Sequence, residues 1–228
     1  MFAGTNGRAC GMRAVVFDLD GTLVNSAPDI AWGINRMLAD YGLPAQDVHA
    51  IEQLTGEGAN VLVAKVYQRL GKRVNDHRIE SDTAAYLAYY RTRPAAESML
   101  YADALETLPL LRRAGLRLAV CTNKVQALAQ VVLDHFEIGR WMDIVVGSDT
   151  TPNRKPHPEP LLHTLNTLGV APADAIFVGD TAIDRDCAAA AGVQCRIVGW
   201  GTGPAVAMSA ASRLYRFSDL LPLAATVG

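Results

Sequence analysis

The chain has 228 residues, which is enough for one sizeable domain or for a core domain that carries a smaller one. Half of the residues are hydrophobic, 19% are charged, and the formal net charge is −2. This balance excludes the strongly basic surface expected of a nucleic-acid-binding or membrane-surface protein. A phosphate-bearing ligand therefore has to be attracted by a local cation or a metal ion.

The cysteines predict free thiols. Cys10, Cys121, Cys187 and Cys195 form no C-x-x-C pair, and three of them lie in apolar segments, as expected in a reducing cytoplasm. No apolar run reaches membrane-spanning length, and residues 1–11 lack the apolar core of a signal peptide. We expect a cytoplasmic protein without a membrane partner, with residues 1–11 as a disordered N-terminal arm.

Short apolar runs alternate with helical patterns along most of the chain. The alternation predicts right-handed βαβ units and a Rossmann-like α/β fold, in which helices flank a parallel sheet. Ligands bind such sheets beyond the carboxyl ends of the strands. The expected strands cover 14–17, 116–121, 144–146, 175–178, 194–198 and 213–217, and the expected helices cover 103–113, 125–136, 158–168 and 183–191, with C-caps at Gly115, Gly169 and Gly192.

Residues 27–95 have a different pattern, with consecutive amphipathic helices and no strand candidate. The helical patterns cover 27–41, 47–53, 58–70 and 78–91. They predict a small all-helical cap domain inserted after the first strand, on an α/β core formed by residues 12–26 and 96–228.

Asp18 and Asp20 directly follow the first expected strand, in Asp-Leu-Asp-Gly-Thr. Side chains two apart on an extended segment point to the same side, so both carboxylates can face one reacting centre. One carboxylate can attack phosphorus, and the other can transfer protons. Taken alone, paired aspartates before a glycine are also ordinary turn residues.

Two further clusters suit a phosphoryl group. Thr122 and Asn123 follow the second core strand, where a hydroxyl and backbone N–H groups at a helix start can hold an anion, although both are also ordinary N-caps. Lys155 lies in a loop stiffened by prolines, where a fixed ammonium can neutralise phosphoryl oxygens. The alternative for Lys155 is a solvated lysine in a proline-rich loop.

Asp180 and Asp184 follow another expected strand, four residues apart. Their hard carboxylate oxygens suit Mg²⁺, although Asp180 could simply cap the helix and leave Asp184 exposed. All of these clusters lie at carboxyl ends of parallel strands, so they can converge. Together with Asp18 they bring three negative charges to a phosphoryl group, which one divalent cation and Lys155 would offset. The set predicts magnesium-dependent phosphoryl transfer.

The ordered motifs resemble those of the haloacid dehalogenase superfamily, over residues 12 to about 203. Residues 18–30 and the run Lys-Pro-His-Pro-Glu-Pro-Leu-Leu at 155–162 are most similar to bacterial phosphoglycolate phosphatases. The resemblance implies a Mg²⁺-dependent phosphatase that hydrolyses a small phosphorylated metabolite through an aspartyl phosphate. It favours 2-phosphoglycolate, which would give glycolate and phosphate.

The resemblance also implies roles for single residues. Asp18 would be the nucleophile and Asp20 the general acid and base. Thr122 and Asn123 would contact the phosphoryl oxygens, and Lys155 would contact both the nucleophile and the phosphate. The dehalogenase branch has no carboxylate at the position of Asp20, because displacing halide needs no leaving-group proton, so this residue favours a phosphatase.

For the metal, the resemblance implies that Asp18, the carbonyl group of Asp20 and Asp180 bind Mg²⁺, with Asp184 as a direct or water-mediated ligand. Gly56 lies in a segment that loosely resembles the family's substrate-specificity loop, which puts the substrate in doubt.

Several alternatives remain open from the sequence. The substrate could be a sugar phosphate such as N-acetylmuramate 6-phosphate, a nucleotide or pyrophosphate, and a phosphosugar mutase would keep the same motifs. A phosphonate hydrolase would need a Schiff-base lysine in the cap, where Lys65 and Lys72 are available. A non-catalytic receiver-like switch would need neither Asp20 nor a cap. The chain could be a monomer or a homodimer.

Overall fold

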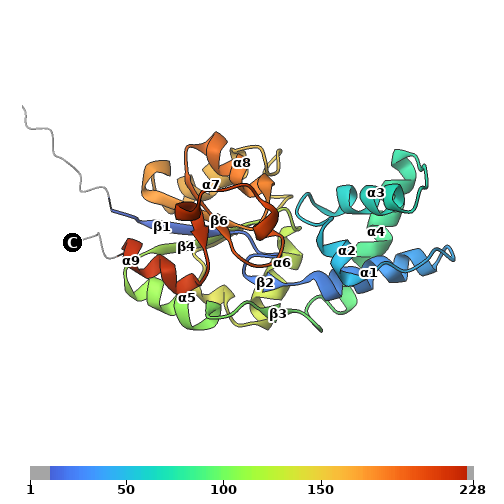
Figure 1. The fold of residues 1–228 in the computed structure, drawn as a ribbon, viewed down its shortest axis with the longest axis horizontal. Coiled ribbons are helices and arrows are strands. Elements are labelled where there is room, and N and C mark those ends of the chain that lie inside the picture. Colours follow the sequence, from blue (N-terminus) through green and yellow to red (C-terminus); the bar gives the residue numbers. More distant parts are fainter. Residues whose placement is uncertain (1–10, 225–228) are drawn as a thin grey trace, which may run out of the picture.

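The sequence correctly predicts a parallel sheet flanked by helices. Six strands pair in the order β5-β4-β1-β6-β7-β8, and every pair is parallel (Figure 1). This computed structural model describes residues 11–224, so residues 1–10 of the expected N-terminal arm lie outside it. The strands are β1 Ala14–Phe17, β4 Arg117–Cys121, β5 Ile144–Val146, β6 Ala175–Gly179, β7 Gln194–Val198 and β8 Arg213–Leu214.

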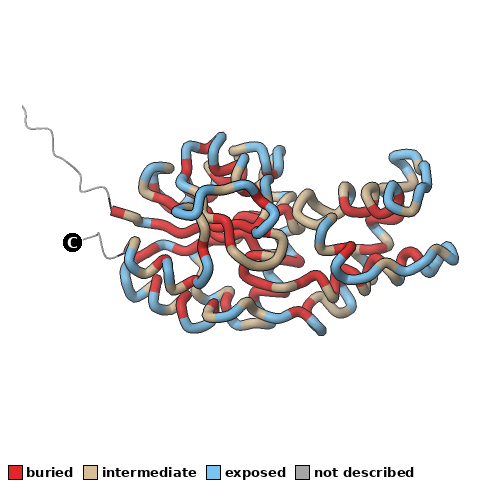
Figure 2. Tube along the Cα trace, viewed as in Figure 1, coloured by how far each residue is buried: buried red, intermediate tan, exposed pale blue. Residues whose placement is uncertain are grey.

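Helices cover both faces of this sheet, which explains why its central strands β1 and β6 are apolar throughout rather than alternating. In β1, Val15 and Phe17 face one apolar cluster, while Ala14 and Val16 face the other. The buried strands run through the middle of the core (Figure 2). Helices α5 (Ala104–Arg113), α6 (Gln126–His135) and α9 (Leu221–Ala224) lie on the first face, and α7 (Glu159–Leu168) and α8 (Ala182–Ala191) lie on the second.

The ends of two helices match the sequence prediction. Gly169 and Gly192 adopt the left-handed conformation as C-caps of α7 and α8, whereas Gly115 lies directly after the C-cap residue of α5. Helix α8 begins with a capping box, in which Thr181 and Asp184 exchange hydrogen bonds. Local helix chemistry thus orients Asp184 before any tertiary contact is considered.

Between β1 and β4 the chain forms a helical insertion, which we define as helices α1–α4. The insertion has its own apolar cluster and lies beyond the carboxyl end of β1 (Figure 1). Its expected role as a separate cap domain, with the boundaries given above, stays a prediction. The helices are α1 Ala27–Ala39, α2 Val48–Glu52, α3 Ala59–Arg69 and α4 Asp76–Thr92.

The two connections to the insertion form a short antiparallel pair that the sequence analysis did not predict. Strand β2 (Val24–Asn25) pairs with β3 (Met99–Leu100). Strands of two residues are too short for any hydrophobic periodicity, so the sequence carried no signal for them.

Two of the sequence expectations concern the chain as a whole. Cys121, Cys187 and Cys195 are free thiols, while Cys10 lies outside the described residues. Within residues 11–224, no helix has both the length and the apolar character needed to cross a membrane.

Candidate active site

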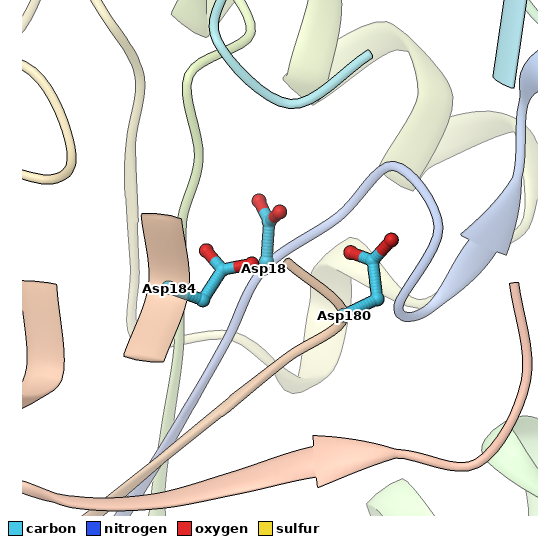
Figure 3. A group of neighbouring side chains, drawn as sticks. All are labelled: Asp18, Asp180 and Asp184. Carbon is cyan, nitrogen blue, oxygen red and sulfur yellow. The ribbon is translucent and has the colours of Figure 1, made fainter. Parts of the chain in front are cut away.

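The structure brings together three aspartates at the carboxyl edge of the sheet. Asp18 follows β1, Asp180 follows the adjacent β6, and Asp184 lies in the first turn of α8. The Asp18 N–H donates to the carbonyl group of Val178, 2.8 Å away, which continues the pairing of the two strands. One carboxylate oxygen from each aspartate lies within 4.8 Å of the others, and all three side chains are buried (Figure 3).

Lys155 supplies a buried cation to this cluster. Its Nζ lies 3.0 Å from Asp18 Oδ1 and 2.6 Å from Asp184 Oδ1, and its side chain is 1% exposed. Burial on its own lowers the pKa of Lys155, but the two carboxylates more than offset this and raise the pKa above its ordinary value. The lysine therefore carries a fixed positive charge next to Asp18.

Charge remains unbalanced in spite of Lys155. Burial raises the pKa of Asp18 to about 6, an effect that Lys155 reduces and Asp184 reinforces. Burial, together with Asp184 and Asp18, also raises the pKa of Asp180 well above its ordinary value. Both pKa shifts have the same cause: three carboxylates and only one ammonium lie together in a space that is buried from water.

The carboxylate of Asp180 is oriented by two hydroxyl groups. Thr22 Oγ1 donates to Asp180 Oδ1 over 3.0 Å, and Thr202 Oγ1 donates to Asp180 Oδ2. Gly21, at φ +82°, lies against the same carboxylate, and a Cβ atom at this position would be 2.3 Å from Asp180 Oδ2. Only glycine allows the turn after β1 to approach Asp180 this closely.

This donor set fits a small divalent cation. Asp18 Oδ1 is buried and has no hydrogen-bond partner among the described residues, although the Lys155 ammonium is within ion-pair distance. An oxygen without a donor, close to oxygens of Asp180 and Asp184, suits a hard cation such as Mg²⁺. Such an ion would also remove the charge imbalance.

Asn123 has different contacts from those expected. Its Nδ2 donates to the carbonyl oxygens of Gly56 and Lys155, each 2.9 Å away, and its Oδ1 accepts from the Lys155 N–H over 3.0 Å. Both amide protons are therefore used within the protein, so the side chain has no donor left for a phosphoryl oxygen. Its neighbour Thr122 is buried at the end of β4, and the Thr122 hydroxyl donates to none of the described residues.

Gly56 lies where the helical insertion meets the core. Its φ is +103°, and a Cβ atom there would be 3.0 Å from Thr181 Cγ2. The segment between α2 and α3 thus approaches the start of α8 more closely than any other residue type would allow. Its carbonyl group receives the hydrogen bond from Asn123.

Asp20 has partners that the sequence analysis did not identify. Lys124 Nζ lies 3.0 Å from both Asp20 carboxylate oxygens, and Ser26 Oγ donates to Asp20 Oδ1 over 2.6 Å. The Lys124 ammonium also lies 4.5 Å from the centre of the Tyr90 ring on α4. Lys124 could have been suspected from its place next to Asn123, whereas Thr202, far along the chain from Asp180, belongs to no recognisable motif.

Comparison with known proteins agrees with this geometry. The family model described as "Haloacid dehalogenase-like hydrolase" matches residues 15–198. The chain belongs to this family.

The relatives are named as phosphatases. A protein of Pseudomonas aeruginosa named phosphoglycolate phosphatase 1 is 37% identical over 218 residues, which cover 93% of this chain and 79% of that protein. A phosphoglycolate phosphatase of Pectobacterium atrosepticum is 35% identical over 217 residues, covering 93% and 92% of the two chains. A solved structure of a predicted phosphoglycolate phosphatase from Haemophilus somnus 129pt has a TM-score of 0.84 and 30% identity, covering 93% of this chain and 97% of that one. Family and relatives together make this chain a hydrolase of phosphoric monoesters.

Proposed function

We propose that this hydrolase transfers the phosphoryl group of its substrate to Asp18 and then to water, with Mg²⁺ bound in the aspartate cluster. The observation that carries the proposal is the Asp18 carboxylate, which is buried and has one oxygen without a hydrogen-bond donor, beside the ammonium of Lys155. A carboxylate has two oxygens, so one oxygen of Asp18 can bind the cation while the other reacts with phosphorus.

Two displacements would make up the reaction. In the first, an oxygen of Asp18 forms a bond to phosphorus while the bond to the leaving oxygen breaks, and Asp20 gives its proton to that oxygen. In the second, Asp20 takes a proton from water, which attacks phosphorus and releases Asp18 and inorganic phosphate. Lys155 and the hydroxyl group of Thr122 would stabilise negative charge on the phosphoryl oxygens throughout.

Mg²⁺ would be held by the carboxylates of Asp18 and Asp180 and by the carbonyl group of Asp20, with Asp184 as a direct or water-mediated ligand. When bound, it supplies positive charge for the phosphoryl oxygens and the aspartates. Asn123 takes a positioning role in this proposal, because its side chain holds the backbone of Lys155 on both sides of the residue.

The names of the relatives favour 2-phosphoglycolate as the substrate. The free thiols of Cys121, Cys187 and Cys195 suit a reducing cytoplasm as the place of reaction.

A phosphosugar mutase would be distinguished from a phosphatase by its products, because a mutase releases no net phosphate. For a phosphonate hydrolase, Lys65 is paired with Glu57 and Lys72 is exposed, so neither is an unpaired buried amine.

A phosphate-release assay over a panel of phosphorylated metabolites tests the proposal. We expect turnover with Mg²⁺, loss of turnover with a chelator, and loss of turnover in Asp18→Asn with an unchanged circular dichroism spectrum. Trapping of radioactive phosphate on the wild-type protein, but not on this variant, would support the covalent step. Full activity of Asp18→Asn would exclude Asp18 as the nucleophile.

A further inference from the structure

A small cavity lies beside Asp20, between the core and the helical insertion. Its walls come from α1, α3, α4 and α6 and from the segment after β4, and its volume is about 60 Å³. Most of the wall is apolar, as at Ile30, Leu62 and Leu128. Since Asp20 would protonate the leaving oxygen, a cavity next to it is where the leaving group of the substrate would lie.

Lys124 is the only cation among the described residues that line this cavity. Its side chain is 7% exposed, so the ammonium is largely removed from water. A buried ammonium requires an anionic partner, and here both carboxylate oxygens of Asp20 fill that role. Lys65 of the insertion is paired with Glu57 and does not line the cavity, and Arg154 lies near Gly58 of the wall without lining it.

One of the other polar residues that line the cavity is Tyr86, which is 4% exposed. Its hydroxyl forms no hydrogen bond within the described part of the chain. A buried hydroxyl on a cavity wall, close to a buried cation, suits an acceptor group on a ligand.

The cavity is small, at about 60 Å³, and most of its wall is apolar. It therefore suits a small leaving group with one anionic end better than a bulky polar one.

We propose that Lys124 is a specificity-determining residue that binds a carboxylate on the leaving group of the substrate, replacing Asp20 as the partner of its ammonium. The exchange would keep Lys124 paired with a carboxylate. Asp20, no longer paired with the ammonium, would take up a proton from water and then donate it to the leaving oxygen. The inference rests on the proposed function and names the residue that would recognise the carboxylate of a phosphorylated hydroxy acid.

The test compares 2-phosphoglycolate with ethyl phosphate, which lacks the carboxylate but has the same two-carbon length. For the wild-type protein we expect kcat/KM for 2-phosphoglycolate to be about 30-fold or more higher, since the carboxylate would form charge-assisted hydrogen bonds. In Lys124→Met this ratio should fall by most of that factor. Any effect of the substitution on Asp20 acts on both substrates and cancels in the ratio.

Matched variants complete the experiment. Lys72→Met removes an exposed lysine and should leave the ratio unchanged, and Tyr86→Phe should lower it by a smaller factor. Equal kcat/KM values of the wild-type protein for the two substrates would overturn the inference, as would an unchanged ratio in Lys124→Met. If Lys124→Met does not fold, the inference is tested on the wild-type protein. It then requires the higher kcat/KM for 2-phosphoglycolate than for ethyl phosphate, and competitive inhibition by glycolate but not by ethanol. Failure of the proposed function would look different, because the wild-type protein would then release phosphate from neither compound nor from any other member of the panel.

Discussion

The side chain of Asn123 joins Gly56 of the helical insertion to Lys155 of the core. A single Nδ2 atom donates to the carbonyl oxygens of both residues, each 2.9 Å away. The position of the segment at Gly56 and the backbone of the lysine beside Asp18 therefore depend on one amide group. The contact therefore links the placement of Lys155 to the placement of the segment at Gly56.

Asn123→Asp is expected to lower kcat about 100-fold. The new carboxylate would face two carbonyl oxygens and repel them, which would shift Lys155 away from its position beside Asp18. Steady-state kinetics and thermal unfolding measure the effect. The control Asn166→Asp introduces the same charge on the exposed face of α7 and should change neither quantity. A kcat within a factor of about three of the wild-type value would show that the hydrogen bonds from Asn123 to Gly56 and Lys155 are not needed for catalysis.

Removing one carboxylate from the aspartate cluster should stabilise the metal-free protein but should abolish the stabilisation by Mg²⁺. Without Mg²⁺, Asp180→Asn should raise the unfolding temperature, because it removes a like charge from the buried group. With Mg²⁺ at about 100 times its Kd, the wild-type protein should gain roughly 5–10 °C and the variant little or nothing. Differential scanning calorimetry checks both. The control Asp186→Asn changes a half-exposed carboxylate on helix α8, which follows Asp180, and should preserve the gain. An equal gain in Asp180→Asn would exclude this aspartate as a ligand.

The metal-free protein should become less stable as the pH rises from about 4 to 7. Burial raises the pKa of Asp18 from 3.8 to about 6, so in this range the folded state binds more protons than the unfolded state. The stabilisation is fully present below the unfolded pKa and is lost as the pH rises through the folded pKa, up to about 3 kcal/mol for a shift of this size. Urea unfolding at several pH values in the presence of a chelator measures it.

Two comparisons isolate this effect from other titrating groups. The slope of stability against pH should decrease in Asp18→Asn, which cannot titrate at this position, and in the wild-type protein with saturating Mg²⁺. A metal-free stability that rises with pH over this range would contradict the electrostatic account of the cluster.

Much of the fold and the acidic part of the site could be predicted from the sequence. Asp18 and Asp180 directly follow apolar runs, and the carboxyl ends of adjacent parallel strands necessarily lie close together. Asp184 follows because one helical turn brings it back over the strand end. These inferences need only local periodicity and a general rule of sheet geometry, so they hold without knowledge of side-chain packing.

The contacts of Asn123, Lys124 and Thr202 could not be predicted in the same way. A side-chain amide can donate a hydrogen bond either to a phosphate or to a backbone carbonyl group. Asn123 donates to the backbone because the carbonyl groups of Gly56 and Lys155 lie within hydrogen-bond distance of it. Lys124 contacts Asp20 over a sequence separation of 104 residues, and Thr202 contacts Asp180 from the segment that follows β7.

By itself, therefore, the sequence determined the layers of the fold, the edge of the sheet at which chemistry occurs, and the acidic groups present there. Local periodicity and the alternation of strands with helices decide these features, and both can be read from short stretches of chain. Tertiary structure alone decided which donor satisfies which acceptor, above all the pairing of Asp20 with Lys124 beside a small cavity. Such pairings depend on distances of a few ångströms between residues far apart in the chain, and hydrophobic patterning is insensitive to differences of that size.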